Sequence, residues 1–159
     1  MDTNPLADQV ADALKGLINA SVNSIKEGNL ANARAFLDQA LSITEMMGYH
    51  AGTAMVLHNY ANLHIVAGDK AAAMEAASLA LEKARLTDGQ STAADIAPYE
   101  KLAQNISLTL QLDGAACVKN RDYRGALACF EAALPHAAAE RKDMLVRQIS
   151  LIKKVLDGR

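Results

Sequence analysis

The chain has 159 residues, of which 51% are hydrophobic, and this is enough to bury one core and predicts a single domain over residues 1–159. The 16 Lys and Arg residues nearly balance 18 Asp and Glu residues, and the net charge of −2 argues against nucleic acid or an anionic membrane as a partner. Two cysteines are too few for a disulfide framework, and the first residues lack a secretory pattern, so a cytoplasmic location is expected.

Seven helices are predicted in chain order, from apolar or small residues that recur at helical spacing. Glycine, asparagine and aspartate mark the turns between them. A longer loop is predicted over residues 88–94. The predicted helices span residues 6–27, 30–47, 50–67, 70–87, 95–120, 123–134 and 139–157.

The third predicted helix lies in a stretch without Asp, Glu, Lys or Arg, from Met46 to Gly68. Its length would in principle allow it to cross a bilayer. Polar residues such as His58, Asn62 and His64 interrupt it, however, and these are costly in hydrocarbon. We therefore expect a helix that is buried on several sides, and no membrane partner.

The fifth and seventh predicted helices have distinctive ends. Asp95 can cap the fifth helix, and Pro98 suits its first turn. The seventh is amphipathic, with basic residues opposite its apolar face, and such a helix would cover the exposed end of a helical stack. Its predicted apolar face holds Met144, Leu145, Ile149, Ile152 and Val155.

The chain carries an internal repeat, because residues 28–41 and 68–81 align without gaps with residues 120–134. Each stretch begins at a turn signal and carries two alanines seven residues apart, which places both on one stripe of a helix. Small residues on that stripe let the axes of paired helices approach closely. The paired alanines are Ala33 and Ala40, Ala73 and Ala80, and Ala126 and Ala133.

This pattern resembles the tetratricopeptide repeat, whose antiparallel helix pairs keep small residues where their axes cross. The resemblance implies an all-α solenoid of three antiparallel helix pairs, at about residues 10–47, 50–87 and 95–138, followed by a capping helix over 139–157. Equivalent alanines are 40 and 53 residues apart (73 − 33 and 126 − 73), against about 34 in the family. The longer spacing is similar to the long-repeat branch typified by kinesin light chains.

In this family the first helices of the pairs form a concave groove that grips extended or helical peptides. Family members that hold acidic chaperone tails use lysine and asparagine where this chain has Ile18 and Val22, although Asn59 matches a second asparagine. The mostly apolar groove implies an apolar or amphipathic partner segment. The predicted partner-binding residues are Ile18, Val22, Ile25, Met55, His58, Asn59, Asn62, Ile65, Leu108 and Gln111.

The sequence thus predicts a protein-interaction scaffold acting as an adaptor, chaperone or regulator, with no enzyme activity and no cofactor. The alternative is self-assembly, in which the groove or the capping helix closes a homodimer. An enzyme or metal protein ranks last, because no catalytic motif occurs and His58 and His64 lie on different faces of their helix. Cys117 and Cys129 are interpreted as packing residues.

Overall fold

Every regular element in residues 5–86 and 93–158, the part of the chain that this computed structural model describes, is a helix. The all-α prediction is therefore confirmed, and each predicted helix end lies within two residues of the observed end. The helices are α1 (Pro5–Lys26), α2 (Leu30–Met46), α3 (His50–Ala67), α4 (Lys70–Arg85), α5 (Ala93–Lys119), α6 (Tyr123–Ala133), the short 3-10 helix η1 (Leu134–His136) and α7 (Ala139–Asp157).

The second helix of each pair begins at the same kind of turn. The side chains of Asn29, Asp69 and Asp122 each accept a hydrogen bond from the backbone N–H three residues later, at 3.1, 3.0 and 2.9 Å. These bonds satisfy a donor that the first turn of a helix leaves free. The residue before each cap is left-handed, with φ of 78°, 82° and 60°. Glycine supplies this conformation in the first two turns and Arg121 in the third.

The start of α5 differs from the prediction. This helix begins at Ala93, so Asp95 lies inside it rather than at its N-cap, and Pro98 is also internal. Two alanines, which are strong helix formers, extend the helix ahead of the position where a cap was expected. The predicted loop over 88–94 falls mostly outside the described residues, and its last two positions are helical.

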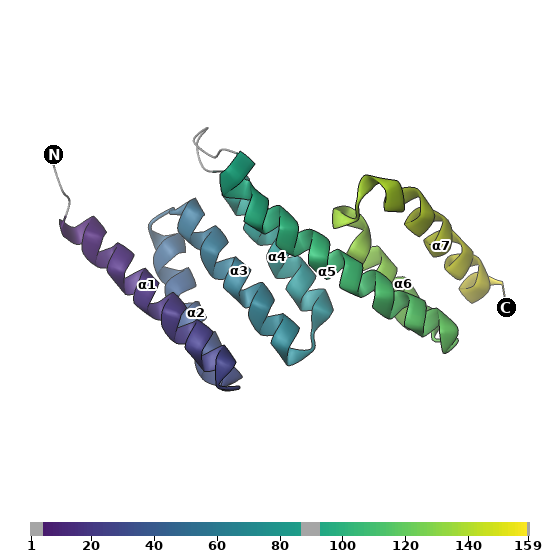
Figure 1. Cartoon of the computed structure of the whole chain (residues 1–159), viewed down its shortest axis with the longest axis horizontal. Coiled ribbons are helices and arrows are strands. Elements are labelled where there is room, and N and C mark those ends of the chain that lie inside the picture. Colours follow the sequence, from purple (N-terminus) through teal and green to yellow (C-terminus); the bar gives the residue numbers. More distant parts are fainter. Residues whose placement is uncertain (1–4, 87–92, 159) are drawn as a thin grey trace.

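The helices pack in consecutive antiparallel pairs, α1 with α2, α3 with α4 and α5 with α6, and the pairs stack side by side (Figure 1). One layer consists of α1, α3, α5 and α7, and the other of α2, α4 and α6. The first and last helices, α1 and α7, lie at opposite ends of the stack (Figure 1). This open arrangement leaves one side of the first layer without a covering layer.

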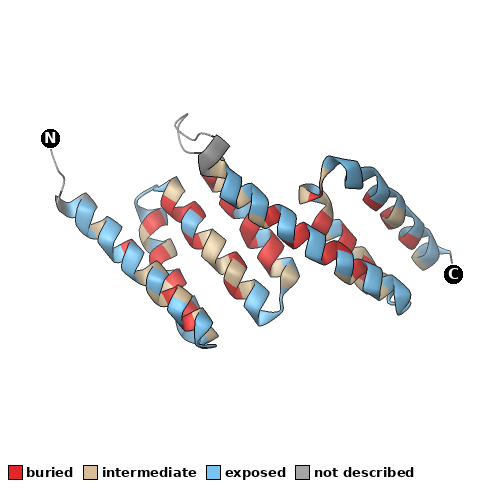
Figure 2. Cartoon of the chain, viewed as in Figure 1, coloured by how far each residue is buried: buried red, intermediate tan, exposed pale blue. Residues whose placement is uncertain are grey.

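The core lies where the two layers meet (Figure 2). The six repeat alanines are at most 1% exposed, so the small-residue stripes face the neighbouring helices as predicted. Gly114 shows how close the crossing is, because a Cβ atom there would come 2.6 Å from the ring of Phe130. Large side chains such as Leu37 and Phe130 fill the remaining space and are themselves buried.

The charge-free stretch forms α3, which packs against α1, α2 and α4. Burial on several sides therefore accounts for its missing charges. Among the described residues, no helix combines the length and the hydrophobicity that a bilayer crossing requires.

Candidate functional site

Two neighbouring cavities open between α5 and α7, and both are lined by Phe130 and Gln148. The cavity nearer the start of α7 has a volume of about 360 Å³, and the one nearer its end has about 280 Å³. Because they share residues, we treat them as two parts of one hollow, the α5–α7 groove. Its floor is the ring of Phe130, which comes from α6 and is 2% exposed.

The wall of the groove on α7 is the second of two apolar faces on that helix. The first face is buried against α6 and the ring of Phe130. The second is spaced at four, three and four residues, which keeps it on one stripe, and Leu151 on it is 61% exposed. The buried face consists of Leu145, Ile149 and Ile152, and the groove face of Met144, Gln148, Leu151 and Val155.

The opposite wall belongs to the second half of α5. It consists of Leu108, Leu112, Ala115 and Val118, and Leu112 is 72% exposed. Isolated exposed apolar residues are ordinary on protein surfaces, but large apolar side chains that face one another across a hollow are characteristic of interaction sites.

The groove stays open because α5 and α7 both pack on α6, while no extensive packing joins α5 to α7 among the described residues. Figure 1 shows α7 set apart from α5, with α6 behind the gap. The connection through η1 ends in the extended residue Ala137, and α7 starts only after it. Five residues, 134–138, therefore lead into α7, against two or three in the turns that follow α1, α2, α3 and α5.

One direct bond crosses the groove near the start of α7. Arg141 Nη1 donates to Gln111 Oε1 at 3.2 Å. The amide of Gln111 in turn donates to Ser107 Oγ at 3.2 Å, and this hydroxyl donates to the carbonyl oxygen of Ala133 at 2.7 Å. This chain of bonds links α7, α5 and the end of α6, and it engages the side chain of Gln111 within the protein.

The structure places two of the ten predicted partner-binding residues, Leu108 and Gln111, in this groove. Leu108 is exposed, whereas Gln111 is buried. The other eight lie on α1 and α3 and line neither cavity. On α1, Ile18 and Ile25 pack against the core cluster around Leu37. The third residue of this helix, Val22, is half-buried.

On α3 the predicted residues differ in exposure. Met55 and Ile65 are exposed, while His58, Asn59 and Asn62 are half-buried. The side chain of Asn59 donates to the carbonyl oxygen of Met55 at 2.9 Å, so its amide nitrogen is already engaged. Within the described part of the chain, these eight residues are therefore not gathered into either part of the α5–α7 groove.

His58 is half-buried beside an aromatic ring. Its ring meets the ring of Tyr99 edge to face, with 5.5 Å between centroids, and its buried Nδ1 atom has no hydrogen-bond partner among the described residues. Burial lowers the pKa of His58 and so favours the neutral imidazole. Its neighbour His64 stacks on Tyr60. The described residues contain no group of three or more His, Cys, Asp or Glu side chains placed to hold a metal ion.

Most groove residues were missed from the sequence because α7 was assigned a single apolar face. The structure corrects that prediction: Met144 and Val155 are exposed at the groove, whereas Leu145, Ile149 and Ile152 are buried against α6. The sequence did hold a signal, since the apolar residues of this helix cover more of its circumference than one packed face requires.

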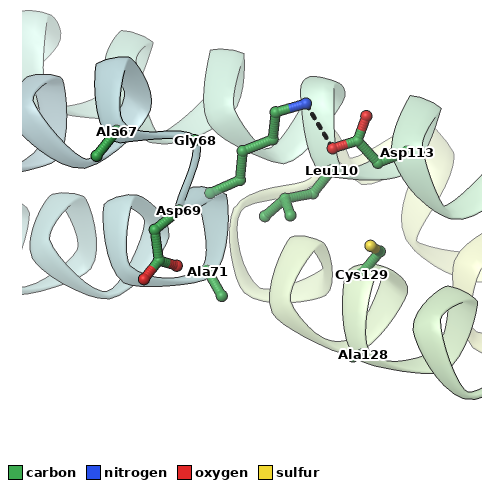
Figure 3. Close-up of a pocket in the computed structure, with 9 residues that line it drawn as sticks. Ala67, Gly68, Asp69, Ala71, Leu110, Asp113, Ala128 and Cys129 are labelled. Carbon is green, nitrogen blue, oxygen red and sulfur yellow. Dashed lines mark hydrogen bonds and ion pairs between the residues drawn. The ribbon is translucent and has the colours of Figure 1, made fainter.

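A separate cavity of about 460 Å³ opens where the α3–α4 turn meets α5 and α6 (Figure 3). Lys70 Nζ and Asp113 Oδ2 form an ion pair at 2.5 Å across it, so each charge already has a partner. Burial, and next the neighbouring Cys117 thiol, raise the pKa of the Cys129 thiol, which makes it a poor nucleophile. These side chains are better suited to joining helices than to chemistry.

Comparison with known proteins adds no relative. No protein-family model matches the chain. No curated protein and no solved structure is significantly similar to it. The resemblance to the tetratricopeptide repeat thus stays a prediction, and function has to be argued from the geometry.

Proposed function

We propose that this chain is a protein-interaction module of the tetratricopeptide-repeat type that docks an α-helical segment of a partner protein in the α5–α7 groove. The observation that carries the proposal is the pair of facing apolar walls, with Leu112 and Leu151 largely exposed above the buried ring of Phe130. Covering these side chains would remove apolar surface from water, which is the main favourable term in association. The proposal includes no catalytic step.

The dimensions of the groove favour a helix as the occupant. Its walls run from Leu108 to Val118 and from Met144 to Val155, which at about 1.5 Å per residue is roughly 15–17 Å, or about three helical turns. A helix of that length can direct an apolar stripe at positions i, i+4 and i+7 into the groove.

An extended peptide fits the same walls less well. It would bring unpaired backbone N–H and C=O groups into the hollow, and these need hydrogen-bond partners. The walls offer mainly hydrocarbon, and the amide of Gln111 is already engaged with Ser107 and Arg141. A helix satisfies its own backbone, so it can lie on an apolar surface without such partners.

Affinity capture with this chain as bait, quantified by mass spectrometry, tests the proposal. Leu112→Glu combined with Leu151→Glu places a carboxylate on each wall and should reduce recovery of a bound partner at least about tenfold, since a charge would have to be buried. The matched control is Val146→Glu, on the same helix, half-exposed and outside the groove, which should leave recovery unchanged. The fragment of the partner that the bound chain protects from limited proteolysis should be helical by circular dichroism.

Two further outcomes would redirect the proposal. Recovery that survives the groove variant but is lost with His58→Ala and Asn62→Ala would move the site to α3. A wild-type dimer in sedimentation that Leu151→Glu dissociates would make a second copy of this chain the occupant, which is the self-assembly function.

A further inference from the structure

The charges that border the α5–α7 groove are mostly positive. On α7 no Asp or Glu occurs from Met144 to Val155, the part that forms the wall. That segment carries Arg147 and Lys154, which are seven residues apart and so lie on one edge of the helix. Lys119 ends α5, directly after the wall residue Val118.

Two of the nearby carboxylates are already engaged in ion pairs. Asp113 is the one acidic residue from Leu108 to Lys119, and it pairs with Lys70 on α4. Glu131 on α6 pairs with Lys153, at 3.3 Å. In contrast, no carboxylate among residues 5–86 and 93–158 lies within ion-pair distance of Lys119, Arg147 or Lys154.

These cations stand beside the smaller of the two cavities. Lys119 follows Val118 and Lys154 precedes Val155, and those two valines line that cavity from its opposite walls. Two acidic residues of α7, Glu140 and Asp143, lie at the other end of the groove and flank Arg141. The third, Asp157, ends the helix two residues beyond Val155 and forms no ion pair with Lys154. The end of the groove formed by the last turns of α5 and α7 therefore has an apolar centre and a cationic margin.

From this complementarity we infer that the partner helix is amphipathic and carries acidic residues beside its apolar stripe, over the end of the groove near Lys119, Arg147 and Lys154. The inference rests on the proposed function and names the chemistry of its ligand. Acidic side chains there gain three cations that form no ion pair with any described carboxylate, whereas basic side chains meet like charge. Exposed ion pairs are individually weak, so the charges select the partner while the apolar stripe supplies most of the affinity.

Two synthetic helical peptides test the inference. Both carry leucines at i, i+4, i+7 and i+11, and the positions beside this stripe are glutamate in one peptide and lysine in the other. By fluorescence anisotropy at low salt, the glutamate peptide should bind about tenfold more tightly, the sum of three weak pairs. High salt should remove most of this difference.

The triple variant Lys119→Glu, Arg147→Glu and Lys154→Glu should reverse the preference. A control triple variant, Lys15→Glu, Lys26→Glu and Arg34→Glu, makes the same change in net charge on exposed residues of α1 and α2 and should keep it. Circular dichroism of each variant verifies that it is folded.

The results separate this inference from the proposed function. If both peptides bind equally and Leu112→Glu abolishes the binding of both, the inference is overturned while the groove stands. If neither peptide binds the wild-type chain, the proposed function and the inference fail together. If the control triple variant reverses the preference as well, the cause is net charge and the inference is also overturned.

Discussion

The two ends of the stack treat neighbouring first-layer helices differently. At the start of the chain α1 contacts α3 directly, and α1 residues such as Ile18 and Ile25 pack on the same core cluster as Val56 and Leu63. At the end of the chain α7 packs on α6 and leaves its second apolar face, with Leu151, toward an open groove. The same helical stack thus has directly packed first-layer helices, α1 and α3, at one end and an open groove between α5 and α7 at the other.

The connections that lead into α3 and into α7 also differ. Three residues, 47–49, link α2 to α3, which packs on α1 as well as on α2. Five residues, 134–138, link α6 to α7, and they include η1 and the extended Ala137. Connection length alone does not set a helix apart, because seven residues, 86–92, lead into α5, which still packs closely on α4. The comparison teaches that the placement of the terminal helix depends first on which of its apolar faces packs on α6.

The largest effect on the free energy of unfolding is expected from a test that compares the two apolar faces of α7. Leu145→Ala should lower the free energy of unfolding by about 2–5 kcal/mol, because the side chain is 1% exposed against α6. Leu151→Ala, six residues away, should change it by less than about 0.5 kcal/mol, because that side chain borders water. Chemical denaturation followed by circular dichroism measures both. Equal losses would mean that Leu151 is packed and the groove is not open.

Two glycines compare the close crossing of α5 and α6, at Gly114, with the open surface of α1, at Gly16. Gly114→Ala should lower the free energy of unfolding by about 1–2 kcal/mol, because the new methyl group meets the buried ring of Phe130. Gly16→Ala should raise it by about 0.5–1 kcal/mol, since a Cβ there meets nothing within 4 Å and alanine favours the helix. Thermal and denaturant unfolding test both, and a stabilising Gly114→Ala would contradict the close approach of α5 and α6.

The equivalent turns of the first and last pairs provide a smaller test. Arg121 adopts a φ of 60°, a conformation that costs a residue with a side chain about 1 kcal/mol. Arg121→Gly should therefore raise the free energy of unfolding by about that amount, and Gly28→Ala, at φ 78°, should lower it by a similar amount. If both changes have the same sign, the turns are not equivalent.

The smallest expected effect is on the pH dependence of the free energy of unfolding, and it concerns His58 on α3. Because burial places the pKa of His58 below 6.5, the unfolded chain takes up a proton at a higher pH than the folded chain. The contribution of His58 to the free energy of unfolding is therefore fully present above pH 6.5, and it falls as the pH drops from there towards the folded pKa. His58→Phe should remove part of that fall in denaturation series recorded across this range. An unchanged pH dependence would show that the ring is solvated.

The helix ends were predictable because they depend on local chemistry. The caps at Asn29, Asp69 and Asp122 need only a side chain and a backbone N–H three residues away, and sequence shows both. The paired alanines were equally predictable, because close helix crossings exclude larger side chains. Asp95 misled for a related reason: a residue able to cap does not end a helix when alanines precede it.

The groove was not predictable to the same degree. Leu108 and Gln111 were found by alignment, but the facing wall depends on how far α7 stands from α5. That distance results from the packing of α7 on Phe130 and from the connection through η1, and neither has a local sequence signal. The contact of His58 with Tyr99 likewise joins residues that are distant in sequence.

The hydrogen bond between Arg141 and Gln111 joins α7 to α5 at one end of the groove. Arg141 is an exposed residue, and among the described residues no equivalent hydrogen bond joins the two helices at the opposite end of the groove. A rotation of α7 about its buried face, Leu145, Ile149 and Ile152, would therefore change the width of the groove more at the end without this bond than at the bonded end. Partner helices with side chains of different size could in this way bind in the same groove.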